Sequence, residues 1–209
     1  MKKILHIAFV AAFAVACYGT AVAQKGEVKF DINYNYSLPM GNFKNNIISN
    51  GSAGGANGEL MFGLSNTLSV GGGLGFQDYY QKYPRAVYQT GSTEATSGVL
   101  SNSIQTIPLL AKITYSPLGG KAGFIQPYIT GGAGISFVNF QQYLGEFGGT
   151  YNATSFAAQA GAGVFIPFGK LSAAGVRLGA DYNYVPYNKE GFGSLNTLDI
   201  RAGVYFPLR

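Results

Sequence analysis

The chain has 209 residues, a length that suits one domain or at most two. It carries 14 Lys and Arg against 9 Asp and Glu, and charged residues make up only 11% of it, against about 25% in ordinary soluble domains. The basic residues are scattered, and no apolar run after the N-terminal segment reaches the length of a membrane-spanning helix, so nucleic-acid binding and a bundle of transmembrane helices are excluded.

The N-terminal segment has the pattern of a cleavable secretory signal peptide. Two lysines near the start precede an apolar stretch over 4–16, and an Ala-Val-Ala cleavage site follows at 21–23. The apolar stretch is too short to span a bilayer, which leaves a buried N-terminal helix as one alternative. Acylation of Cys17 is another, because the residues before it loosely resemble a lipoprotein box. We predict a signal peptide over 1–23 and one domain over 24–209.

After this segment, apolar and polar residues alternate with a period of two, which is typical of strands with two different faces. Over 28–36, for example, every even position is apolar or aromatic and every odd position is polar. The pattern predicts eight strands, at about residues 28–36, 53–64, 67–77, 103–115, 125–138, 154–166, 174–186 and 196–206. Each is long enough for a tilted membrane strand, which needs about 9–11 residues.

The connections between these strands alternate in length. Long loops are predicted at 38–52, 78–102, 139–153 and 187–195, and the intervening connections are shorter. Long loops on one rim and short turns on the other are typical of bacterial outer-membrane barrels. Within the fourth strand, Pro108 cannot donate a ladder hydrogen bond, so we expect a bulge there.

Alternation does not say which strand face points inward. A soluble lipocalin-like barrel would bury its apolar face around a ligand, but such a barrel should carry many surface charges. Aromatic residues also fall into two belts, near the long-loop rim at Tyr36, Phe76, Phe137, Phe156 and Tyr184, and near the short-turn rim at Phe62, Tyr115, Phe168 and Phe206. Aromatic belts mark the two interfaces of a bilayer, so we predict that the apolar face meets outer-membrane lipid.

Three segments resemble a known family. They are Ser-Leu-Pro-Met-Gly-Asn-Phe at 37–43, Ile-Pro-Leu-Leu-Ala-Lys at 107–112 and Pro-Tyr-Ile-Thr-Gly-Gly-Ala-Gly at 127–134. The family is the outer membrane protein β-barrel domain family, similar in architecture to small OmpA/OmpX-type barrels. The resemblance implies an all-β, eight-stranded antiparallel up-and-down transmembrane barrel in the outer membrane of a Gram-negative bacterium, inserted by the barrel-assembly machinery.

The chain departs from the family pattern near its end. It finishes Phe-Pro-Leu-Arg at 206–209, without the terminal aromatic residue of the usual assembly signal. It also shows no C-terminal peptidoglycan-binding domain, so the resemblance does not imply a wall-tethering role.

The residues of the predicted domain argue against catalysis. The histidine of the chain is His6 and the cysteine is Cys17, and both lie within the predicted signal peptide. The commonest general bases, nucleophiles and metal ligands are therefore missing from 24–209, and we predict no enzyme, no cofactor and no metal site. Glycine runs at 71–75 and 131–134 lack the Lys-Ser/Thr ending of phosphate-binding loops, and we interpret them as small strand residues.

Charged residues share the inward-facing parity of the predicted strands. They are Lys29, Asp31, Glu59, Lys112, Arg177, Asp181, Asp199 and Arg201, four of each sign. Unpaired charges in a low-dielectric lumen are costly, so this balance predicts mutual pairing. The pairs would form either a plug that closes the lumen or a gate that opens a narrow ion path.

The longest predicted loop is rich in tyrosine. Tyr79, Tyr80, Lys82, Tyr83, Arg85 and Tyr88 are candidate surface contacts for an extracellular protein or glycan, and the alternative is an unselective mobile loop. The function predicted from the whole sequence is a non-enzymatic outer-membrane barrel with a structural or surface-interaction role and a lumen closed by paired charges. The alternative is a narrow porin-like channel for ions or very small solutes.

Overall fold

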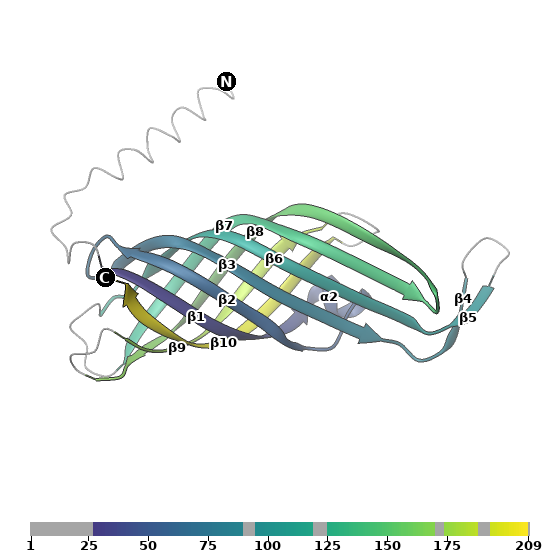
Figure 1. Ribbon diagram of the computed structural model, residues 1–209, viewed down its shortest axis with the longest axis horizontal. Helices are drawn as coiled ribbons and strands as arrows, with labels where there is room; N and C mark the ends of the chain where they lie inside the picture. Colours follow the sequence, from purple (N-terminus) through teal and green to yellow (C-terminus); the bar gives the residue numbers. More distant parts are fainter. Residues whose placement is uncertain (1–26, 90–94, 119–124, 170–173, 188–192, 209) are drawn as a thin grey trace, which may run out of the picture.

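The computed structural model describes residues 27–89, 95–118, 125–169, 174–187 and 193–208, and the predictions made for 1–23 lie outside them. Eight antiparallel strands close into a barrel in the order β1-β10-β9-β8-β7-β6-β3-β2 (Figure 1). Their bounds are Val28–Met40 (β1), Ser52–Gly63 (β2), Leu68–Lys82 (β3), Leu100–Tyr115 (β6), Gln126–Leu144 (β7), Phe147–Pro167 (β8), Gly175–Pro186 (β9) and Ser194–Leu208 (β10). The predicted eight-stranded antiparallel barrel is confirmed.

Three further elements lie in the connections. They are α2 (Gly41–Asn46), β4 (Ala86–Gln89) and β5 (Ala95–Gly98), of which the last two form a separate two-stranded sheet. In the part of the chain that the structure describes, no helix has the length and apolar character needed to cross a membrane.

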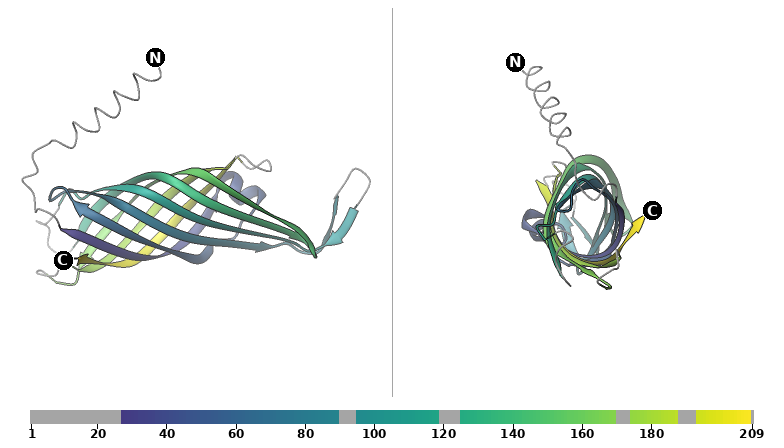
Figure 2. Two further views of the ribbon diagram at one scale, coloured as in Figure 1. Left: turned by 45° about the horizontal axis from the view of Figure 1, so that its top comes forward. Right: turned by 90° about the vertical axis from the view of Figure 1, so that its left-hand side faces the viewer.

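The first and last strands close the barrel. Their pairs run without interruption from Val28↔Leu208 to Met40↔Asn196, so both ends of the barrel domain lie at the same rim. At that rim β2 and β3 are joined by a short turn, in which Leu68 O accepts from the backbone N–H of Leu64 and Ser65. The two longest connections, over 41–51 and 83–99, lie at the opposite rim, called the long-loop rim below, and carry α2, β4 and β5 (Figure 2).

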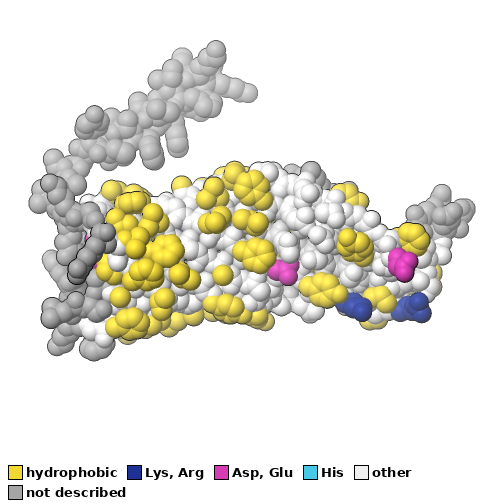
Figure 3. All heavy atoms as spheres, viewed as in Figure 1, with side chains coloured by type: hydrophobic (Ala, Val, Ile, Leu, Met, Phe, Trp, Pro, Cys, Tyr) yellow, Lys and Arg dark blue, Asp and Glu magenta, His cyan; other side chains and the backbone are white. Residues whose placement is uncertain are grey.

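The strand faces are divided by polarity, with apolar side chains outside and polar ones inside. On the outer face Ile129 is 59% exposed and Leu74 is 56% exposed, whereas Asp31 and Arg177 inside the barrel are almost fully buried. In the face shown in Figure 3, hydrophobic side chains are spread along the barrel body and are densest toward the end that carries the two chain termini, an acidic side chain lies near the middle, and the visible Lys and Arg side chains lie toward the end that bears β4 and β5. A lipocalin-like arrangement, with the apolar face turned inward, is therefore wrong for this chain.

Four strands extend beyond the others at the long-loop rim. Pairs between β7 and β8 continue as far as Leu144↔Phe147, so a tight turn that includes Gly145, at a φ of +64°, joins the two strands. The predicted long loop over 139–153 is wrong, because its Asn, Gln and Gly residues belong to the ends of two long strands. With β3 and β6, these strands form a projecting wall, defined here as residues 77–82, 100–106, 136–144 and 147–157 (Figure 1).

The pairing around Pro108 differs from the expected bulge. The pairs Leu74↔Leu109 and Gln77↔Thr106 keep the same register on both sides of the proline, so neither strand has an extra residue. Instead the ladder lacks two pairs beside Pro108, where a Cβ on Gly75 would lie 3.1 Å from the proline Cγ. Glycine thus accommodates the ring without a bulge, and a register shift lies instead between Asn35 and Ser37, in the β1–β2 pairs.

Candidate functional site in the barrel lumen

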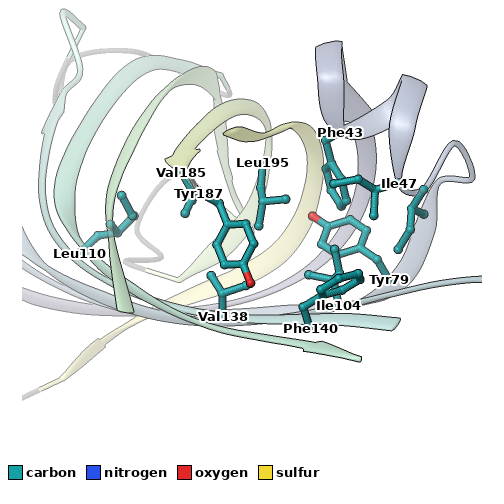
Figure 4. Packing of buried hydrophobic residues seen from close by; sticks show 12 residues of the cluster. Phe43, Ile47, Tyr79, Ile104, Leu110, Val138, Phe140, Val185, Tyr187 and Leu195 are labelled. Carbon is teal, nitrogen blue, oxygen red and sulfur yellow. The ribbon is translucent and has the colours of Figure 1, made fainter. Parts of the chain in front are cut away.

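A buried apolar cluster fills the lumen near the long-loop rim and is called the cap below. Its members are Phe43, Ile47, Ile48, Tyr79, Ile104, Leu110, Val138, Phe140, Ala157, Val185, Tyr187 and Leu195 (Figure 4). The first three belong to α2 and the residues after it, which fold into the end of the barrel rather than away from it. Three side chains hold this segment, since Tyr83 Oη and Asn102 Nδ2 both donate to Ile47 O and Gln81 Oε1 accepts from Ser49 N–H at 2.5 Å.

A layer of ion pairs lies deeper in the lumen and centres on Glu59. Its carboxylate contacts three cations from three other strands, with Lys112 Nζ at 2.5 Å, Arg177 Nη1 at 2.6 Å and Arg201 Nη1 at 2.6 Å. Arg177 also binds Asp31 at 2.5 Å, and Arg201 also binds Asp181. All of these side chains are at most 3% exposed, so the lumen is closed at this level by charges that bridge across it. We call these six residues the charge layer.

Aromatic rings continue this closure toward the short-turn rim. Arg177 Nε donates to Tyr128 Oη at 2.9 Å, and its guanidinium carbon lies 4.6 Å from the centroid of the Tyr128 ring and 5.3 Å from that of the Phe165 ring. The Phe165 ring in turn contacts the Tyr205 ring edge to face at 5.1 Å. A cation held against aromatic faces is stabilised by their quadrupoles, and this contributes on the order of 1 kcal/mol or more when the pair is desolvated.

The remaining two predicted lumen charges lie apart from the charge layer. Lys29 has the inward parity but stands at the start of β1, where its side chain is 39% exposed and pairs with Glu27 at 3.4 Å. The prediction that Lys29 belongs to a lumen network is therefore wrong, because a residue at the end of a strand lies at the rim even when its side chain has the inward parity. Asp199 is buried in the lumen, but it accepts hydrogen bonds from Ser37 Oγ and Asn183 Nδ2 rather than from a cation.

A chain of hydroxyl groups joins Asp199 to the cap. Ser37 Oγ donates to the Asp199 carboxylate and lies 2.6 Å from Tyr79 Oη. Because a serine hydroxyl has one proton and a carboxylate only accepts, the tyrosine must donate to the serine. The Tyr79 ring packs edge to face on Phe43 of α2 at 5.1 Å, so the polar interior and the cap share this tyrosine.

A cavity of about 60 Å3 lies between the cap and the charge layer. Its lining includes Phe43 and Leu110 from the cap and Glu59 and Arg201 from the charge layer. Polar side chains on the strands also line it, among them Asn35, Asn57, Gln77, Gln159, Asn183 and Asp199, although most of its accessible surface is apolar. A cavity of this size has room for roughly four water molecules.

The carboxylates of the charge layer are all engaged by cations. Among the described residues, no group of three or more His, Cys, Asp and Glu side chains is placed to hold a metal ion. The Glu59 carboxylate is occupied by three cations, and the other two carboxylates of the charge layer are each paired with an arginine.

Part of the tyrosine-rich segment that was predicted as a loop belongs to strand β3. Tyr79, Tyr80 and Lys82 belong to β3, and Tyr79 is 3% exposed within the cap, so its assignment as a surface contact is wrong. Its neighbour Tyr80 points outward and is 57% exposed. Lys82 and Arg85 are also exposed, whereas Tyr83 and Tyr88 are half-buried. Partial burial raises the pKa of the Tyr83 phenol, and the nearby Tyr88 adds to this rise in pKa.

The sequence prediction missed the cap and the aromatic support of Arg177. Phe43, Ile47 and Ile48 lie in a segment predicted as a loop, although three large apolar residues in a polar stretch are a signal for burial. Phe165 has the inward parity of β8, between the outward Val164 and Ile166, and this parity marks it as a lumen residue.

Replacing Glu59 by Gln tests the charge layer. The variant keeps the size of the side chain but leaves three buried cations with one carboxylate fewer, so we expect the free energy of unfolding to fall by about 3–5 kcal/mol. Urea titration of the folded protein in detergent micelles measures this loss. The matched control is Lys29→Gln, which removes a charge at the rim and should change stability by at most about 0.5 kcal/mol. Equal stabilities of the two variants would contradict a structural role for the charge layer.

The fold is shared with solved outer-membrane proteins. No protein-family model matches the chain, and no curated protein sequence matches it. Neisserial surface protein A is similar with a TM-score of 0.53, over 88% of this chain and 97% of that chain, at 14% identity. Ail, the attachment invasion locus protein of Yersinia pestis, has a TM-score of 0.52 over 88% and 100% of the two chains, at 14% identity.

A third similar structure is a major outer membrane protein from Thermus thermophilus, with a TM-score of 0.51 over 87% of this chain and 99% of that chain, at 13% identity. Similarity at these identities is a likeness of fold. The chain therefore has the fold of small eight-stranded outer-membrane barrels, as the resemblance of its strand segments indicated.

Proposed function

We propose that this chain is a non-enzymatic barrel of the bacterial outer membrane, with a closed lumen and a surface-interaction role at its long-loop end. The observation that carries the proposal is the double closure of the lumen, by the charge layer and by the cap. A lumen closed in this way cannot pass solutes, so the exposed parts of the molecule must carry its function.

The outer face supports a place in the membrane. Large apolar side chains are exposed on every strand of the barrel, among them Ile32, Phe62, Leu74, Leu109, Ile135, Phe156, Leu178 and Ile200. An exposed apolar area that surrounds the whole barrel is far larger than the patches that soluble monomers carry. With the polar face turned inward, lipid is the solvent that matches the outer face. On this proposal, residues 1–23 are the signal peptide that exports the chain.

The projecting wall supports a surface role. It carries exposed aromatic side chains, with Phe147 at 76%, Tyr80 at 57% and Tyr151 at 42% exposed, and the β4–β5 hairpin beyond it exposes Val87 at 69%. The exposed Lys82 and Arg85 add positive charge to the same end. Aromatic and arginine side chains are enriched where proteins bind other proteins, so this surface suits an extracellular protein or glycan as its partner.

Placing an arginine at either of two alanines tests the membrane placement. Ala111 is exposed in the middle of β6, between the outward residues Ile107 and Tyr115, and Ala86 is exposed on β4 beyond the barrel. We expect Ala111→Arg to lower the free energy of unfolding in lipid vesicles by about 2–4 kcal/mol, because the guanidinium would lie near the bilayer midplane. Ala86→Arg should have an effect of less than about 0.5 kcal/mol. A harmless Ala111→Arg would count against lipid on this face.

Cysteine labelling tests which end faces outward. We expect a membrane-impermeant maleimide to label Val87→Cys on intact cells and to leave Leu118→Cys, at the short-turn rim, unlabelled until the envelope is opened. No native cysteine lies in residues 24–209, so the introduced thiol is the only site in the predicted mature chain. The reverse pattern would place the wall in the periplasm, and labelling of both sites would contradict insertion in the outer membrane.

Planar-bilayer recording tests the closed lumen. Protein shown to be folded by its unboiled gel shift should give no discrete conductance steps, because both the charge layer and the cap block the path. A boiled sample of the same preparation serves as the control for contaminating pores. Discrete steps from the folded sample would favour the narrow channel. An unchanged step size in Glu59→Gln would then argue against the charge layer as its gate.

A further inference from the structure

The cavity between the cap and the charge layer is mainly apolar, although it lies in a polar lumen. Most of its accessible surface belongs to apolar groups. Four large apolar side chains from α2 and three strands contribute to it and lie within the lumen (Figure 4): Phe43, Leu110, Val185 and Leu195. Because β6 and β10 lie opposite each other in the closed barrel, apolar side chains meet the cavity from both sides of the lumen.

The amide donors of the lining are engaged within the barrel wall. Asn57 Nδ2 donates to Glu59 at 3.0 Å, and Gln159 Nε2 donates to Asn183 at 2.7 Å. Asn183 Nδ2 in turn donates to Asp199 at 2.7 Å. The remaining amide oxygens of Asn57 and Gln159 find no partner in the described part of the chain, but they are buried and present almost no surface to the cavity. A polar ligand would therefore meet few groups that it could bind.

The charges that border the cavity do not favour an ionic ligand. Lys112 and Arg201 belong to its lining, but Glu59 binds the first at 2.5 Å and the second at 2.6 Å. The buried charged residues of the described segments comprise four carboxylates and three cations, so an anion would add to a negative charge already in excess. A cation would lose its water against a mainly apolar lining, which is costly. The ligand that matches the cavity is therefore neutral.

The size of the cavity sets the size of its ligand. Its volume of about 60 Å3 takes roughly four water molecules, which occupy about 120 Å3 in the liquid. An engineered apolar cavity of about 150 Å3 in another protein stays dry and binds benzene or xenon. A molecule of the size of benzene therefore fits this cavity, whereas a whole lipid acyl chain is too large.

The cavity reaches the barrel wall where the β3–β6 ladder is interrupted. Residues 73–77 of β3 line it, and so does Pro108 of β6, beside which the ladder lacks two pairs. Leu74 and Phe76 belong to this lining although their side chains are exposed on the outer face. The cavity is also not enclosed on every side. With the barrel in the membrane as proposed, lipid lies across this part of the wall, so apolar molecules dissolved in the lipid are close to the cavity.

We propose that the cavity binds one small, neutral, apolar molecule of about the size of benzene. The ligand contacts the ring of Phe43 on the side of the cap and the aliphatic side chains of Leu110 and Val185 on the strands. Binding removes the apolar surface of the ligand and of the lining from water, and this removal drives it. Because the cap and the charge layer close the lumen, this space is a binding pocket and not a passage, and the inference goes beyond the proposed surface role.

Xenon and benzene serve as probes, and both are tested on crystals of the full chain grown from detergent micelles. We expect xenon gas under pressure to give one anomalous-scattering peak in the cavity, and a benzene soak to give a ring of electron density at the same position. Measurement in detergent makes the result independent of the proposed membrane placement. Ordered water in place of both probes would overturn the site, and xenon without benzene would overturn the assigned ligand size.

Two neighbouring leucines of β6 provide a variant and its matched control. Leu110→Phe fills the cavity from its lining, so we expect xenon occupancy to fall at least fivefold and the benzene ring to be lost. Leu109→Phe makes the same change on the exposed outer face and should bind both probes as the natural chain does. Equal xenon occupancy in the two variants would overturn the proposal. Should Leu110→Phe fail to fold by its gel shift, Ala157→Val narrows the same cavity from β8, and unchanged xenon occupancy in that variant would overturn the proposal equally.

Discussion

The contact of Glu59 with three cations is the interaction on which the rest of the interior depends. The four side chains come from β2, β6, β9 and β10, so the ion pairs reach across the lumen and tie opposite parts of the wall together. None of these charges could be buried alone, because an unpaired ion in this interior would cost several kcal/mol. The barrel therefore has to close in the strand register that brings all of these charges together. The backbone hydrogen bonds between strands set the register, and the ion pairs form only in the correct register.

The same pairing explains why the barrel can present an apolar face outward. Buried charged and polar groups need ion-pair or hydrogen-bond partners. The lumen, which is lined by Asn, Gln, Thr and paired ions, supplies most of these partners within the protein. The outer face is then free to be aliphatic over the body of the barrel, with exposed aromatic residues near both ends. The exposed charges Lys82 and Arg85 lie beyond the body, where the wall projects. The few charges of the chain thus lie in two places, inside the lumen and at the projecting end. This placement accounts both for the ion pairs in the lumen and for the apolar outer face.

The strands and the inward parity of Asp31, Glu59, Lys112, Arg177 and Asp181 could be predicted from the sequence, because a period of two is a local property. Three features could not. The depth of a residue depends on strand ends and register, which is why Lys29 lies at the rim although its parity is inward. Residues 139–153 were predicted as a loop because many of them are polar, but they extend two strands that pair with each other on the projecting wall. The burial of Tyr79 and of α2 arises from packing between distant segments, which local alternation does not report.

Asp199 links the polar interior of the lumen to the cap. Tyr79 packs on Phe43 of the cap and donates to Ser37, which donates to Asp199, so the order of α2 is connected to the charge of a buried carboxylate. A displaced α2 would admit water to the cavity, and hydration would then compete for the carboxylate that Ser37 and Asn183 hold when the cap is in place. The apolar cap and the hydrogen bonds beneath it thus stabilise each other. Opening of the long-loop end therefore requires the loss of the apolar packing around Phe43 together with the hydrogen bond between Tyr79 and Ser37.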